Sequence, residues 1–229
     1  IKGGVSRIRG MRVGTSWREA TSMEKGYPLW YFRGYKTSGI DPSTGNPIFV
    51  DVDKDGEITD KDQTYIGDPH PDLIYGANLF MEYKGFDFNL FLQGVSGNEI
   101  LMGWIRIDRS TCNRPLLFYE NRWTTNNNNA SRPKANADER TFMSDQLIFD
   151  GSYMRIKQIQ LGYTLPKDIT GKLLISKVRL YVSLDDYFTF TKYKGMDPEA
   201  GSEEDSSLGI DRGVYPVPRK MLFGLTVSF

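Results

Sequence analysis

Residues 51–62 combine acidic side chains and a glycine at a spacing that suits a metal ion. Carboxylates stand at the first, third, fifth and twelfth positions, a glycine at the sixth and an apolar residue at the eighth. This spacing is that of the calcium loop, in which hard oxygen donors surround the ion and the glycine permits a sharp turn. We therefore expect a Ca²⁺ site. Its predicted ligands are the side chains of Asp51, Asp53, Asp55 and Asp62 and the main-chain carbonyl of Glu57.

The flanking sequence indicates what such an ion would do. Residues 47–50 show no helical pattern, so the loop is EF-like without being half of a paired, helix-switching EF-hand. We expect a structural Ca²⁺ that pins a long loop. The twelfth position holds Asp62, where glutamate is usual, and the shorter side chain weakens the expected site. The alternative is an acidic, solvated loop without a metal.

Residues suited to catalysis are few. His70 is the single histidine and lies between two prolines, and Cys112 is the single cysteine. Asp185 and Asp186 are adjacent in a predicted strand, so they point to opposite faces and cannot act as a glycosidase pair. We therefore predict that the chain is not an enzyme.

Composition excludes further classes. The 29 basic and 29 acidic residues balance, so there is no electrostatic reason to expect a nucleic-acid partner. The sequence has no apolar run of the roughly 20 residues that a transmembrane helix needs. Any membrane crossing must therefore use strands. Aromatic residues at 13% and 23 glycines are typical of antiparallel β structure with many turns.

Alternation of apolar and polar residues is the main structural signal. In Met221–Phe229 every odd position is apolar, whereas most even positions are small or polar. Successive side chains of a strand point to opposite faces, so this strand has one apolar face. Four other segments repeat the pattern, and residues 27–36 and 1–13 are further candidate strands. The four are Tyr75–Tyr83, Phe86–Gln93, Gln158–Leu165 and Val178–Leu184.

The connections between these strands alternate in length. Residues 84–85 and 166–176 are short connections, whereas the others are long, and transmembrane barrels combine short periplasmic turns with long external loops. The long connections are residues 37–72, 96–151 and 189–217. We predict an all-β fold, an antiparallel transmembrane β-barrel segment with long extracellular loops. The alternative is a soluble β-sandwich, a calcium-dependent glycan-binding module, since sandwich strands alternate too.

Many aromatic side chains fall in the long connections. Aromatic faces stack on sugar rings, so a glycan-binding surface is one interpretation, and packing of loop against loop or against a partner is the other. The aromatic residues in question include Trp104, Phe118, Tyr119, Trp123, Phe142, Phe149, Tyr193 and Tyr215.

Several motifs resemble, in their order, segments of the SusC/RagA family of TonB-dependent outer-membrane receptors. Together they cover nearly the whole chain. The motifs are residues 26–40 (GYPLWYFRGYKTSGI), 66–76 (IGDPHPDLIYG), 82–95 (EYKGFDFNLFLQGV), 121–124 (NRWT), 150–157 (DGSYMRIK), 161–166 (LGYTLP) and 189–199 (TFTKYKGMDPE).

The resemblance implies that residues 1–229 are the C-terminal part of a receptor barrel of 22 strands, without the N-terminal plug and the earlier strands. It implies a Gram-negative outer membrane, with lipid around the barrel and residues 37–72 as an extracellular loop. The implied partners are a SusD-like surface lipoprotein and, through the N-terminal part, TonB. The implied function is TonB-dependent import of nutrients, which are oligosaccharides or, in some members, peptides.

Overall fold

The computed structural model describes residues 6–13, 16–105, 114–135, 138–171, 175–199 and 208–229. The chain divides into two units, each with its own sheets. The long-strand unit consists of Asp72–Gly97, Gly151–Lys192 and Pro216–Phe229. The short-strand unit consists of Ile1–Pro71, Asn98–Asp150 and Tyr193–Tyr215.

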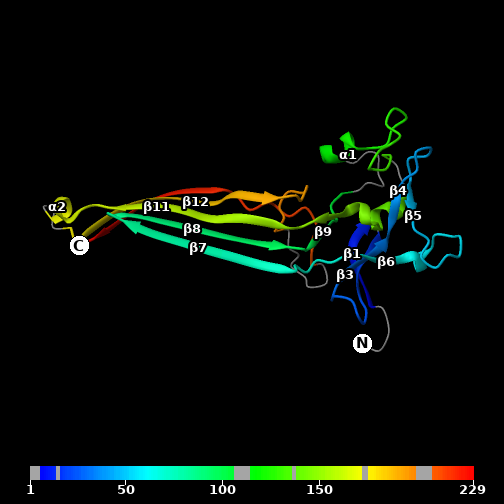
Figure 1. Ribbon diagram of the computed structural model, residues 1–229, viewed down its shortest axis with the longest axis horizontal. Coiled ribbons are helices and arrows are strands. Elements are labelled where there is room, and N and C mark those ends of the chain that lie inside the picture. The colour runs from blue at the N-terminus through cyan, green and yellow to red at the C-terminus, as the bar shows by residue number, and fades with distance from the viewer. Residues whose placement is uncertain (1–5, 14–15, 106–113, 136–137, 172–174, 200–207) are drawn as a thin grey trace. The chain divides into compact units, whose positions relative to one another are not determined.

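Five antiparallel strands form the long-strand unit in the order β14-β12-β11-β8-β7 (Figure 1). All five alternating segments of the sequence are strands, so the all-β, antiparallel prediction is confirmed. The strands are β7 (Leu73–Tyr83), β8 (Phe86–Ser96), β11 (Tyr153–Thr164), β12 (Lys177–Thr191) and β14 (Lys220–Ser228). The short helix α2 (Lys167–Thr170) lies between β11 and β12.

One face of this sheet is apolar and exposed. The register pairs Leu79 with Leu90 and Leu180 with Leu225, so the apolar positions of neighbouring strands share a face. Phe223 on that face is 76% exposed. The described residues of this unit form one sheet layer and α2, without a second sheet to cover these side chains. The sheet therefore lacks the second layer that a β-sandwich requires.

The opposite face carries polar side chains that bond across strands. Arg179 of β12 binds Asp87 of β8 through Nε at 2.8 Å and Nη2 at 2.5 Å. The pair crosses Gly162 of the intervening strand β11, where a Cβ would stand 2.4 Å from Asp87 Oδ2. Glycine at this position therefore allows one ion pair to link β8 and β12 across β11.

A register shift interrupts β11 between Ile156 and Gln158, in its pairing with both neighbouring strands. Lys157 lies within the shift and forms an ion pair with Asp186 of β12, with 3.1 Å between Nζ and Oδ1. Asp186 has φ of +55°, a left-handed conformation that is uncommon for residues other than glycine. This β-bulge was not predicted, because the alternating segments Gln158–Leu165 and Val178–Leu184 stop short of it.

Short strands make up the other unit. A four-stranded sheet has the order β1-β2-β3-β6, and a three-stranded sheet has the order β10-β9-β13, in which β9 and β13 are parallel. The first sheet contains β1 (Ser6–Val13), β2 (Ser16–Met23), β3 (Tyr31–Tyr35) and β6 (Gln63–Gly67). The second contains β9 (Glu99–Met102), β10 (Ile148–Asp150) and β13 (Ile210–Asp211). The strands β4 (Thr37–Ile40) and β5 (Pro47–Phe49) form a hairpin.

Four short helices complete this unit, which has its own apolar core. The helices are η1 (Asp60–Asp62), α1 (Leu116–Glu120), η2 (Glu139–Met143) and η3 (Asp145–Leu147). The core includes Phe32, Ile100, Met102, Phe118, Phe142, Leu147, Tyr193 and Ile210. Phe118, Phe142 and Tyr193 were candidates for a glycan surface, and their burial assigns them to loop packing instead.

The strand predicted over residues 27–36 is wrong in its first part. Residues up to Trp30 belong to a turn that contains Gly26 at φ of +95° and Trp30 at φ of +58°, and β3 begins only at Tyr31. The strand predicted over residues 1–13 corresponds to β1, and residues 1–5 lie outside the described residues. Cys112 also lies outside them. Among the described residues no helix has the length and apolarity needed to span a membrane.

Candidate metal centre

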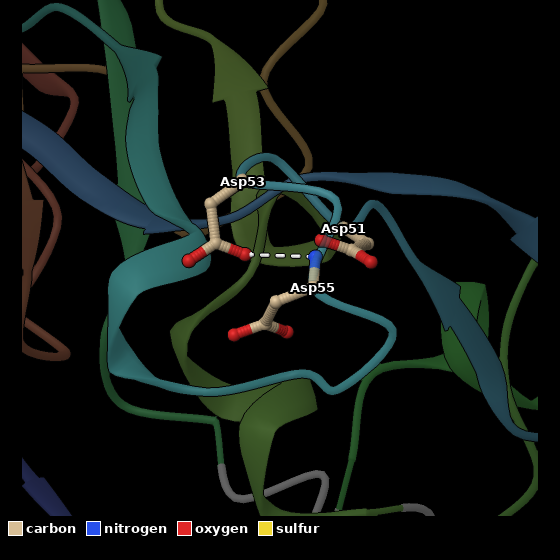
Figure 2. Close-up of side chains that lie close together, drawn as sticks. All are labelled: Asp51, Asp53 and Asp55. Atoms are coloured by element: carbon tan, nitrogen blue, oxygen red, sulfur yellow. Dashed lines mark hydrogen bonds between the residues drawn. The ribbon is translucent and has the colours of Figure 1, made fainter.

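The acidic loop begins directly after β5 and ends in η1. Figure 2 shows the side chains of Asp51, Asp53 and Asp55 gathered around one point. One carboxylate oxygen from each lies within 4.8 Å of those from the other two. The structure thus brings together three of the five predicted ligands.

Main-chain amides hold this arrangement. Asp51 accepts hydrogen bonds from the amide of Lys54 at 2.6 Å and from that of Gly56 at 2.8 Å. Asp55 accepts one from the amide of Glu57 at 2.9 Å. Lys54 and Gly56 have φ of +61° and +87°, so the chain turns sharply where the sequence places the glycine. The backbone of the loop is therefore folded around its carboxylates.

Asp62, the predicted twelfth-position ligand, is fully buried and faces the backbone of the loop. Its Oδ1 accepts from the amide of Val52 at 2.8 Å, and its Oδ2 accepts from the amide of Thr59 at 2.7 Å. The bond from Thr59 is the main cause that holds the pKa of Asp62 below its usual value. Both oxygens thus have partners within the loop, and coordination of a cation by Asp62 stays a prediction. Coordination by the Glu57 carbonyl stays a prediction.

Two side chains from distant segments attach the loop to the short-strand unit. Arg140 Nη1 donates to the carbonyl oxygen of Ile58 at 3.1 Å, and Tyr35 Oη donates to Asp60 Oδ1 at 3.0 Å. Neither contact was predicted, because Arg140 lies 82 residues from Ile58 and the sequence contains no spacing rule that pairs them.

This arrangement can hold a cation and does not resemble a catalytic site. Among the residues that the structure describes, its donors are carboxylate oxygens, as hard cations such as Ca²⁺ prefer. The single histidine, His70, has its Nε2 atom 2.8 Å from the carbonyl oxygen of Leu29 and lies in a turn. The donor chemistry therefore fits calcium.

Sequence comparison with known proteins finds TonB-dependent receptors. The chain is 34% identical to TonB-dependent receptor P3 of Formosa agariphila over 93% of its own length and 23% of that receptor. It is 30% identical to TonB-dependent receptor SusC of Bacteroides thetaiotaomicron over 81% of its own length and 18% of SusC. The chain thus spans about a quarter or less of the length of these relatives. No family model matches it.

Solved structures of RagAB show the same fold. The chain superposes on the RagAB peptide transporter with a TM-score of 0.75 at 24% identity. It also superposes on the RagAB peptide importer in the open-open state with a TM-score of 0.75 at 25% identity. Each match covers 92% of this chain and no more than 24% of the solved one. This chain belongs to the SusC/RagA family of TonB-dependent receptors, of which it forms part of the β-barrel with its loops.

Proposed function

We propose that the chain supplies a wall segment and loops of a receptor that imports nutrients across the outer membrane of a Gram-negative bacterium. The observation that carries this proposal is the single sheet of the long-strand unit, apolar on one face and polar on the other. Such a sheet suits a barrel wall that has lipid on its outer side and a polar lumen on its inner side. Unpaired edge strands are prohibitive in lipid, so the remaining strands of the receptor close the barrel.

The partners and cargo follow from the relatives. We propose energy input from TonB through the N-terminal part of the receptor, and a SusD-like surface lipoprotein as partner. Oligosaccharides are the proposed cargo, and peptides are the second candidate because the structural relative RagAB is a peptide importer. Exposed rings in the short-strand unit, such as Tyr27, Tyr65 and Tyr215, support a sugar-binding surface.

Two adjacent residues of β11 test the assignment of the faces. Leu161 lies on the apolar face and Gln160 on the polar face. Arginine at these two positions therefore compares the proposed lipid side of the sheet with the proposed lumen side. Arginine on a lipid face costs about 2–4 kcal/mol at the bilayer midplane, and lumen positions tolerate it. We expect Leu161→Arg to reduce the amount of folded receptor in outer membranes, measured by heat-modifiable gel mobility, and Gln160→Arg to leave it unchanged. Equal yields of both variants would contradict the assignment.

Cargo class is tested in a strain whose only copy of the receptor gene is deleted. Uptake of labelled oligosaccharide and peptide pools is compared with the complemented strain, with and without functional TonB. We expect oligosaccharide uptake to need both the receptor and TonB. If only peptide uptake needs the receptor and TonB, peptides are the cargo. If neither oligosaccharide uptake nor peptide uptake needs them, the proposal of import is overturned.

Calcium is the proposed structural cofactor of the loop at residues 51–62. The gathered carboxylates and the buried Asp62 support it. Calorimetric titration of the purified, EGTA-stripped receptor with Ca²⁺ should give one saturable site that Asp51→Asn with Asp53→Asn abolishes. Asp41→Asn is the control, because Asp41 is another loop carboxylate, bonded to Ser43 and Thr44. Absence of saturable heat from the unmodified receptor would show that the loop binds no calcium.

A further inference from the structure

One peptide group of the acidic loop is held at both of its ends. It joins Ile58 to Thr59, at the eighth and ninth positions of the loop. Its carbonyl oxygen accepts from Arg140 Nη1 at 3.1 Å, and its amide donates to Asp62 Oδ2 at 2.7 Å. Because a peptide group is planar and rigid, this peptide links the Arg140 guanidinium to the Asp62 carboxylate through a single rigid unit.

Arg140 is itself fixed in place. Its guanidinium forms a fork with Asp138, with Nε 3.0 Å from Oδ1 and Nη2 2.5 Å from Oδ2. The guanidinium lies over the ring of Phe49, 5.2 Å from the ring centroid, in the strand that leads into the loop. A planar guanidinium in such a fork loses little further freedom when it makes one more bond. Arg140 is thus held by Asp138 and Phe49 in the position from which it donates to the loop.

Paired helices do not frame this loop, whose last turn is held by the bond from Tyr35 to Asp60 and by a capping box between Thr59 and Asp62. In an EF-hand, flanking helices hold the two ends of the loop, whereas here a three-residue strand, β5, precedes the loop and the three-residue helix η1 ends it. Asp62, at the last position, is oriented by the Ile58–Thr59 peptide and the amide of Val52, together with the bonds of its own amide to Thr59.

We propose that Arg140 is a positioning residue of the calcium site. By fixing the Ile58–Thr59 peptide it orients the Asp62 carboxylate, and it restrains the adjacent peptide that carries the Glu57 carbonyl. Arg140 itself makes no bond to the ion. This inference rests on the proposed calcium site and adds to it a residue from a segment far along the chain.

Calorimetric titration of the intact, EGTA-stripped receptor with CaCl₂ tests the proposal. Removal of groups that orient metal ligands typically weakens metal binding about 10–100-fold. We expect Arg140→Met to raise the Kd for Ca²⁺ by at least about tenfold, and Arg140→Lys, which keeps one donor, to be intermediate. Arg122→Met is the matched control, because Arg122 also lies over a ring in this unit, that of Tyr119 at 5.1 Å. Arg122→Met should bind Ca²⁺ like the unmodified receptor.

Thermal unfolding separates positioning from a general effect on stability. If Arg140 positions the ligands, Arg140→Met loses most of the calcium-induced rise in Tm. If Arg140 only stabilises the unit, the Tm in EGTA falls while the calcium Kd stays unchanged, and the proposal is overturned. Failure of the unmodified receptor to bind Ca²⁺ would instead remove the calcium site itself, and the role of Arg140 with it.

Discussion

Replacement of Tyr193 by phenylalanine should loosen the parallel strand pair β9–β13. The Tyr193 hydroxyl donates to Asp211 Oδ2 at 2.5 Å, and both side chains are buried. Asp211 also accepts from Trp104 Nε1 at 3.0 Å and from the amide of Gly213 at 2.8 Å, so the carboxylate keeps two donors in the variant. The ring of phenylalanine can still pack on Phe149, so no cavity of side-chain size forms.

The expected cost is therefore that of one hydrogen bond to a charged group, about 2 kcal/mol. A cost of this size corresponds to an increase of roughly 30-fold in the opening equilibrium of the strand pair. Hydrogen exchange of the intact receptor measures it at the amides of Leu101 and Gly103, which donate to Gly209 O and Asp211 O. In Tyr193→Phe, exchange at these two amides should be about 30-fold faster than in the unmodified receptor, provided that exchange occurs through opening of the strand pair.

Tyr119→Phe is the control for this measurement, because Tyr119 is 52% exposed in the same unit. It should leave the exchange of both amides unchanged. An effect of Tyr193→Phe smaller than about threefold, or one equal to that of the control, would refute the reasoning. The hydroxyl of Tyr193 would then contribute no more to the stability of the β9–β13 pair than the exposed hydroxyl of Tyr119 does.

Three further predictions concern the short-strand unit. Burial raises the pKa of Tyr193, and its hydrogen bond to Asp211 raises it further. The protonated hydroxyl therefore stabilises the fold fully below about pH 10, the ordinary tyrosine pKa, and this stabilisation is lost progressively as the pH rises above it. Hydrogen exchange of β9, corrected for intrinsic rates, should therefore accelerate at high pH in the unmodified protein and not in Tyr193→Phe. Burial and neighbouring carboxylates raise the pKa of Glu99, so Glu99→Gln should raise Tm at pH 7, and this gain should shrink as the pH falls and disappear near about 4.5, the ordinary glutamate pKa. Gly45→Ala should make the β4–β5 hairpin more sensitive to proteolysis, because the new Cβ would stand 2.5 Å from the Trp123 ring and Gly45 has φ of +72°. Gly26→Ala is the control: Gly26 has φ of +95° and no atom near the new Cβ, so this variant measures the backbone strain alone, about 1–3 kcal/mol.

The long strands were predictable because one physical rule acts on every residue in them. A wall between two different surroundings needs apolar and polar positions in strict alternation, as in Met221–Phe229, and this pattern survives in a single sequence. The β-bulge at Lys157 and Asp186 was missed because it lies just beyond the alternating segments Gln158–Leu165 and Val178–Leu184. The acidic loop was predictable for a related reason, since its ligand spacing is local.

The short strands could not be predicted in this way. Strands β9 and β10 contain three or four residues each, too few for periodicity to be distinguished from chance. Their stability comes from a shared core and from bonds between distant residues, such as that of Tyr193 to Asp211. Aromatic residues of this unit were equally ambiguous, because a ring that packs a core and a ring that binds a sugar have the same letter in the sequence.

The connections along the chain indicate what a Ca²⁺ ion in the acidic loop would restrain. Strand β7 begins only a few residues after β6, which follows the acidic loop and η1 directly. Strand β11 begins just after β10, which follows the segment containing Arg140. The two segments that meet at the Ile58–Thr59 peptide therefore continue into two strands of the wall, β7 and β11, which both pair with β8. Fixing that peptide would tie these two segments together within the short-strand unit, whereas a calcium loop in a free-standing hairpin would restrain only itself.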